Sequence, residues 1–283
     1  MSVAEASTWR PHRRFSTRFY RSELRLMSLR RRNIAGVAAL AALPIVIAIV
    51  MFATKPGPGE GPPLFAGMLD NGLIAALAGL GIELALFLPI AVSVIAGDTI
   101  AGEANIGTLR YLLTTPVGRV RLLAVKFASL VTWIFAVVAI VGFTGGLTGV
   151  ILFGTGDMAT LSGTTIPFGE AFLRVLEAAV YMALCLVAVG AIGMFVSTLT
   201  EQPIGGAVAM MMFVIISQIL GAITQLDWLH PYLISHYWTS YIDLLRDPAA
   251  WDQVGMGLLS ALLWTALGLS AAWARLTTKD ITS

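Results

Sequence analysis

Charged residues are scarce in this sequence. Lysine, arginine, aspartate and glutamate make up 12% of its 283 residues, whereas they make up about 25% of an average soluble domain. Hydrophobic residues reach 57%, so the chain has too little polar surface to cover a water-exposed globule. This composition excludes an ordinary soluble domain and indicates that lipid surrounds much of the chain.

Several kinds of chemical site are also missing. The single cysteine, Cys185, excludes a disulfide framework and a cysteine-rich metal site. None of the three lysines follows a glycine as the nucleotide-binding P-loop requires, and neither H-E-x-x-H nor G-x-S-x-G occurs. His230 and His236 lie six residues apart, a spacing that predicts no metal site. We therefore expect a non-catalytic chain that holds no cofactor or metal itself.

Six apolar runs are long enough to cross a bilayer, because a spanning helix needs about 20 mostly apolar residues. They cover approximately residues 34–53, 72–96, 122–147, 171–199, 204–224 and 254–273. The predicted fold class is an all-α membrane protein with six transmembrane helices. Its expected parts are a cytoplasmic N-terminus (1–33), a six-helix transmembrane domain (34–275) and a cytoplasmic tail (276–283).

Basic residues are distributed unevenly along the chain. Nine arginines lie within the first 32 residues, and a cytoplasmic N-terminus places fifteen of the eighteen basic residues inside. Only Lys55, Arg174 and Arg246 then lie outside. The positive-inside rule predicts a multi-pass protein of the plasma (inner) membrane with both termini cytoplasmic. Residues 30–32 also resemble a twin-arginine export signal, but five further spans oppose that interpretation.

The basic N-terminal segment has helical periodicity. Four arginines share one face at spacings of 4, 3 and 4, and apolar residues adjoin them. This pattern predicts an amphipathic helix lying in the membrane interface, with its arginines toward lipid phosphates. A surface for a cytoplasmic partner is the alternative. The predicted membrane-surface anchor comprises Arg14, Arg18, Arg21 and Arg25.

The polar stretch between the second and third runs carries the most information. From Gly97 to Lys126 it reads GDTIAGEANIGTLRYLLTTPVGRVRLLAVK. Two acidic residues lie near its start, and Gly107-Thr108 allows a sharp turn. Thr115 and Pro116 are typical of a helix N-terminus.

This stretch resembles the loop after the second span in permeases of the ABC type-2 (ABC-2) transporter family. The family pattern there is an Asp, a Gly-Glu, a Gly-Thr-Leu, a Leu-Leu, a Pro-Val, an Arg and a Lys. The matching positions are Asp98, Gly102, Glu103, Gly107, Thr108, Leu109, Leu113, Pro116, Val117, Arg119 and Lys126. Elsewhere the likeness is one of layout, with six spans, a basic N-terminal helix and a short tail.

The resemblance implies the ABC type-2 exporter fold, in which this loop forms a cytoplasmic coupling helix that docks on a separate ATPase. It implies two permeases, identical or homologous, and two ATP-binding-cassette ATPase subunits in each complex, with ATP and Mg bound by the ATPases. Membrane lipids are expected partners and nucleic acid is not. The implied ATPase-coupling residues are Asp98, Gly102, Glu103, Gly107, Thr108, Leu109, Arg110 and Arg119. Stabilisation of the loop alone is the alternative role.

Two polar side chains inside the apolar runs are candidates for a substrate path or gate. Glu83 lies near the middle of the second run, where a charge costs about 2.5–3.5 kcal/mol on insertion scales. It is either a substrate-contacting or gating carboxylate, or a protonated group bonded to a neighbouring helix. Gln218, in the fifth run, can hydrogen-bond between helices.

These features predict the permease subunit of an ATP-binding-cassette exporter that moves a lipid, a drug or another amphiphile. A stand-alone secondary transporter or channel is the alternative. Such a protein needs several intramembrane ionisable groups and broken helices. In the sequence, only Glu83 is such an intramembrane ionisable group.

Overall fold

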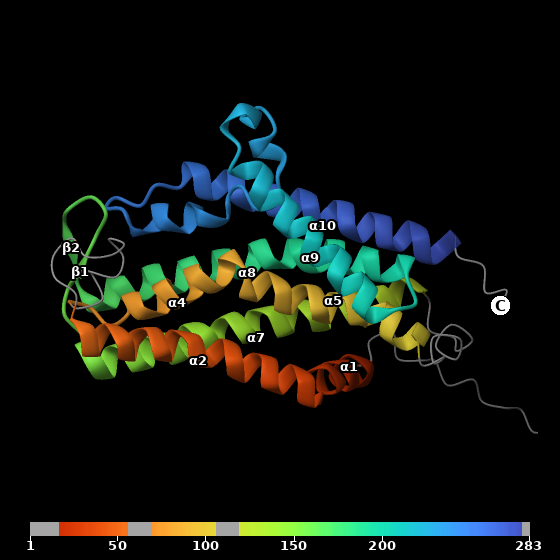
Figure 1. The fold of residues 1–283 in the computed structure, drawn as a ribbon, viewed down its shortest axis with the longest axis horizontal. Coiled ribbons are helices and arrows are strands. Elements are labelled where there is room, and N and C mark those ends of the chain that lie inside the picture. The colour runs from red at the N-terminus through yellow and green to blue at the C-terminus, as the bar shows by residue number, and fades with distance from the viewer. Residues whose placement is uncertain (1–16, 56–69, 106–118, 279–283) are drawn as a thin grey trace, which may run out of the picture.

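The computed structural model describes residues 17–55, 70–105 and 119–278, which fold mainly as helices (Figure 1). Six helices within this part are long and apolar enough to span a membrane: α2 (Arg31–Thr54), α5 (Phe87–Asn105), α7 (Arg119–Phe153), α8 (Phe168–Leu199), α9 (Pro203–Gly221) and α10 (Asp252–Thr278). The other elements are α1 (Thr17–Leu29), α4 (Ile74–Ala85), β1 (Met158–Ala159), β2 (Thr165–Ile166), η1 (Thr224–Leu226), η2 (His230–Tyr232) and η3 (Trp238–Leu245). The predicted class, an all-α multi-pass membrane protein, is confirmed.

Helix α8 forms the centre of the bundle and packs against α5, α7, α9 and α10. In its most apolar stretch 72% of the residues are buried, against 17% for α2 and 22% for both α9 and α10. Gly193 allows a close approach, because a Cβ at this position would lie 2.7 Å from the Cβ of Ala96 on α5. The less buried helices present apolar sides that suit contact with lipid.

Helices α2, α4 and α7 pack together at glycines of α7. A Cβ at Gly145 would lie 3.0 Å from both Ala76 Cα of α4 and Pro44 Cβ of α2. One turn later, Gly149 lies against the backbone of Gly72. Small residues let membrane helices approach closely enough for dispersion contacts to hold them together. These glycines therefore set the spacing of the three helices.

The predicted second span, 72–96, is divided into α4 and α5, although the sequence predicts one helix. Pro89 provides the reason. It has no N–H to donate to the carbonyl of Ala85 four residues earlier, and its ring crowds that carbonyl. Leu86, between the two helices, has a non-helical backbone with φ −146° and ψ −55°.

The two ends of the bundle are different. Helix α1, the last turns of α5 and α10 and the first turn of α7 lie together at one end, here called the α1 end (Figure 1). The β1–β2 hairpin and the start of α10 lie at the opposite end. Residues 106–118, which contain the predicted coupling helix, lie outside the described part of the chain.

Candidate functional site

Asp98, on α5, lies against two arginines from the start of α2. Arg30 Nη1 donates to Asp98 Oδ2, and Arg32 Nη2 lies 3.1 Å from the same oxygen. Gly102, one turn farther along α5, packs on this carboxylate, since a Cβ there would lie 3.1 Å from Asp98 Cγ. The ion pairs connect α2 to the last part of α5.

A second ion cluster connects three helices around Lys126. The Lys126 Nζ of α7 lies 2.5 Å from Glu103 Oε1 of α5 and 3.2 Å from Glu23 Oε2 of α1. Lys126 is 3% exposed, so its charge depends on these carboxylates for compensation. The cluster fixes α1 against α5 and α7.

The same part of α5 is also bound to the bundle interior. Ser197 Oγ of α8 accepts hydrogen bonds from the backbone N–H groups of Ile100 (3.1 Å) and Ala101 (2.9 Å). It donates to the carbonyl of Gly97 at 2.7 Å. Gly97 also touches α9, because a Cβ there would lie 2.7 Å from the backbone nitrogen of Ala207. The end of α5 is therefore held by polar contacts on one side and close packing on the other.

The predicted ATPase-coupling residues fall into two groups. Those that the structure describes are Asp98, Gly102, Glu103 and Arg119; Gly107, Thr108, Leu109 and Arg110 lie outside the described residues. Asp98 and Glu103 both lie within α5, which continues through Asn105. They therefore lie at the end of a spanning helix, where both form ion pairs within the chain.

Arg119 joins the start of α7 to the end of α10. Its Nη1 donates to the carbonyls of Leu276 (2.8 Å) and Thr277 (3.0 Å). The last carbonyls of a helix have no partner within the helix, and a cation is favoured at that terminus. Arg119 thus supplies both a donor and a complementary charge.

The predicted membrane anchor corresponds to α1. Its arginines Arg18, Arg21 and Arg25 are exposed, whereas Arg14 lies outside the described residues. The hydroxyl groups of Tyr20 and Thr132, 2.6 Å apart, connect this helix to α7. The arginines remain accessible to charged groups outside the bundle, as an anchor requires.

Gln218 and Glu83, the predicted substrate-path residues, both lie near the division between α4 and α5. Gln218 Nε2, on α9, donates to the Ala85 carbonyl at 2.7 Å, which is the carbonyl that Pro89 leaves without a helical donor. Glu83 is fully buried, and neither of its carboxyl oxygens has a hydrogen-bond partner in the described part. The structure thus gives Gln218 a backbone partner, and none of the described helices forms a hydrogen bond with Glu83.

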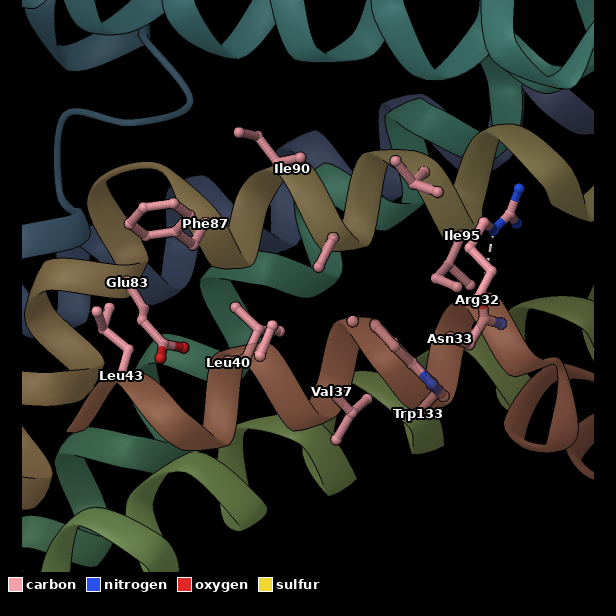
Figure 2. A pocket seen from close by; sticks show the side chains of 14 residues that line it. Arg32, Asn33, Val37, Leu40, Leu43, Glu83, Phe87, Ile90, Ile95 and Trp133 are labelled. Carbon is pink, nitrogen blue, oxygen red and sulfur yellow. Dashed lines mark hydrogen bonds between the residues drawn. The ribbon is translucent and has the colours of Figure 1, made fainter. Parts of the chain in front are cut away.

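Glu83 lines a cavity of about 420 Å³ between α2, the α4–α5 pair and α7 (Figure 2). We call it the Glu83 cavity. Glu83 lies near one end, and Arg32 and Asn33 lie at the other. Between them the lining is apolar and includes Leu40 and Trp133.

A protein-family model described as "ABC-2 family transporter protein" matches residues 26–218, which is more than half of the chain. The chain belongs to the ABC-2 family. It is accordingly the membrane permease component of an ABC transporter, and the resemblance seen in residues 97–126 is confirmed. A search of the curated proteins finds no match.

The sequence does not predict four residues that form or adjoin the ion clusters of this ABC-2 permease. They are Glu23, Arg30, Arg32 and Ser197. Glu23 had a signal, because it is the only acid on the otherwise basic α1. Lys126 matches the family pattern, but the pattern does not identify its partners. Arg30 and Arg32 belong to the basic N-terminus, which predicts orientation and no pairing. Pairing across about 70 to 100 residues leaves no local pattern in a single sequence.

Proposed function

We propose that this ABC-2 permease is the transmembrane subunit of an exporter driven by a separate ATP-binding-cassette ATPase. It moves an amphiphilic substrate outward across the plasma (inner) membrane, with both termini on the cytoplasmic side. The working complex contains two permeases, identical or homologous, and two ATPases, which bind ATP and Mg. The printed sequence supports an external source of energy because it contains no P-loop.

The polar connections at the α1 end carry this proposal. Helix α5 ends at Asn105 and α7 begins at Arg119, so a force on the segment between them acts on both helices. Asp98 links α5 to α2, and Glu103 links α5 to Lys126 of α7, which in turn pairs with α1. Arg119 links α7 to α10. Packed helices joined by ion pairs can carry such a displacement across the bundle. A partner that acts at this end therefore moves several spans together.

A stand-alone secondary transporter is the second candidate, and one observation favours it. Discontinuous helices with an intramembrane carboxylate accompany substrate and ion sites in such proteins, and Glu83 lies beside the division between α4 and α5. A secondary transporter is also expected to contain several ionisable groups inside the membrane. Glu83 and Lys126 are the only charged side chains buried in the described part, and Lys126 belongs to the ion cluster at the α1 end.

Co-isolation and transport distinguish the two candidates. We expect the tagged full chain, purified from its native membrane, to bring an ATP-binding-cassette ATPase with it. Vesicles holding both proteins should transport an amphiphile only when ATP is present. Asp98→Asn combined with Glu103→Gln should lower the transport per ATP hydrolysed, whereas Asp157→Asn, an exposed site near the β1–β2 hairpin, should not.

The opposite result is equally clear. Transport or conduction by the permease alone in liposomes, driven by an ion gradient, would refute the exporter proposal and support the secondary transporter.

A further inference from the structure

Glu83 is a carboxyl group at membrane depth that has no hydrogen-bond partner among the described residues. Its exposed fraction is 0%, and both of its oxygens lack a hydrogen bond in the described part of the chain. Leaving a buried polar group unsatisfied costs about 1–3 kcal/mol, and more when the group is charged. Figure 2 shows the carboxyl group directed between α2 and α4, at one end of the residues that line the Glu83 cavity. The wall of the cavity therefore includes a strong acceptor that the described part of the fold leaves unused.

The size and walls of the cavity suit a small amphiphile. Its volume of about 420 Å³ lies in the range of about 300–1,000 Å³ seen for small-molecule sites. Along α2 the lining extends from Arg32 to Leu43, or about 16 Å at a helical rise of 1.5 Å per residue. Apolar side chains form most of the wall, including Val37, Leu40 and Ile90.

The polar groups at the far end of the cavity already have partners. Arg32, the one basic residue in the lining, pairs with Asp98 at 3.1 Å. Asn33 Nδ2 donates to the backbone carbonyl of Met27 at 2.6 Å. Figure 2 shows both side chains at the end opposite Glu83. The described lining thus offers an acidic group and no counter-charge for it.

The helix division gives independent support for a site here. Glu83 and Phe87 lie on opposite sides of Leu86, and both line the cavity. Irregular backbone at membrane depth is tolerated where it borders protein or a cavity. An aromatic ring beside a carboxylate offers a cation a second favourable contact.

We propose that the Glu83 cavity binds a hydrophobic cation, a molecule with an apolar body and one cationic group, and that Glu83 supplies the counter-charge. The apolar walls cover the body of the ligand, and Phe87 lies beside the cationic group. This assignment names the substrate class of the exporter, so its physiological meaning depends on the proposed function. Binding itself does not depend on the ATPase.

Equilibrium binding of radiolabelled tetraphenylphosphonium to the full chain in lipid nanodiscs tests the proposal. We expect saturable binding of this cation and, in a separate assay, no saturable binding of radiolabelled tetraphenylborate, an anion of the same shape. Glu83→Gln should weaken affinity about tenfold or more, because it removes one member of a buried charge pair. Glu170→Gln, which changes a carboxyl on α8 that pairs with Arg174, should leave affinity unchanged.

A second variant, which fills the cavity, keeps the proposal testable if Glu83→Gln does not fold. Gly36 lines the cavity, and a Cβ there meets no atom within 4 Å. Gly36→Leu should therefore fill the cavity without a backbone clash and abolish binding. Gly255, on α10, is equally open but does not line the cavity, so Gly255→Leu is the matched control.

Three results would overturn the inference: no saturable binding of the cation, unchanged affinity in either Glu83→Gln or Gly36→Leu, or equal binding of the cation and of tetraphenylborate, which indicates an apolar groove without charge selection. Failure of binding while an ATPase co-isolates removes this inference alone. Saturable binding without any ATPase partner removes the exporter proposal and leaves the cation site in place.

Discussion

The ion pairs of Lys126 contribute more to stability than those of Asp98, because they are more deeply buried. Its side chain is 4% exposed, and the two carboxylates around it are 13% and 16% exposed. Removing one member of such a buried group costs about 3–5 kcal/mol, because the remaining charges lose compensation. The arginines on Asp98 are about half exposed (48% and 53%), and exposed pairs contribute about 0–1 kcal/mol. The Lys126 cluster is therefore the main polar attachment of α1.

Lys126→Met should lower the free energy of unfolding by about 3 kcal/mol, because it removes the buried cation that Glu23 and Glu103 share. Thermal unfolding of the purified chain in detergent measures the change. Lys55→Met, at an exposed position after α2, is the matched control and should change little. Adding Glu103→Gln to Lys126→Met should restore part of the loss. Equal unfolding temperatures for both lysine variants would contradict the ion-cluster interpretation.

At the scale of the elements, the division of the second span depends on two residues far apart in the sequence. Pro89 removes the donor that the Ala85 carbonyl requires, and Gln218 of α9 replaces it at 2.7 Å. In lipid no water can take that place. The division is therefore stable only because α9 packs beside it.

Gln218→Leu should destabilise the chain by about 1–3 kcal/mol, the cost of leaving an acceptor unsatisfied, because lipid offers the Ala85 carbonyl no other donor. A Pro89→Ala background supplies a backbone N–H for Ala85, so the same replacement should cost less there. The coupling in this double-mutant cycle is the quantity to measure. Gln225→Leu, at an exposed position after α9, is the control. Simple additivity of the two changes would exclude the proposed role of Gln218.

The contact between α7 and α10 gives a second prediction for an element. Arg119→Gln should release the last turn of α10, whose carbonyls at Leu276 and Thr277 lose their donor. Hydrogen exchange in residues 274–278 should then become faster. Arg121→Gln alters an exposed neighbour on α7 and should not affect this segment. The same acceleration in both variants would indicate a general charge effect.

At the scale of the whole molecule, the distribution of charge and the arrangement of helices suggest the same orientation. The exposed arginines of α1 and the last turn of α10 lie at one end of the bundle, with the β1–β2 hairpin at the other (Figure 1). Basic residues favour the cytoplasmic side. We therefore expect the α1 end to face the cytoplasm.

Cysteine labelling in intact cells tests this orientation. In a Cys185→Ser background, Asp157→Cys near the hairpin should react with an impermeant maleimide. Thr278→Cys, at the end of α10, should react only after the cells are permeabilised. Both positions are exposed in the structure, so access to the reagent and not burial controls the reaction. Labelling of Thr278→Cys alone in intact cells would reverse the proposed topology.

The sequence by itself determined the class of this protein and its family. Long apolar runs predict spans because hydropathy is a local property, and the pattern from Asp98 to Lys126 identifies the ABC-2 permeases because it is a continuous motif. Pro89 also carried a readable signal for the division of the second span. Composition, spacing and motif were sufficient for these conclusions because none of them depends on how the helices are rotated.

Only the tertiary structure decided which polar groups meet. Glu23 of α1 and Glu103 of α5 both reach Lys126. Gln218 of α9 reaches the Ala85 carbonyl of α4. The sequence left two roles open for Glu83, and the packing of α2, α4 and α7 placed it beside a cavity, with no hydrogen-bond partner in the part of the chain that the structure describes. The rotation and spacing of helices fix such contacts, and these depend on small residues such as Gly145 at interhelical positions.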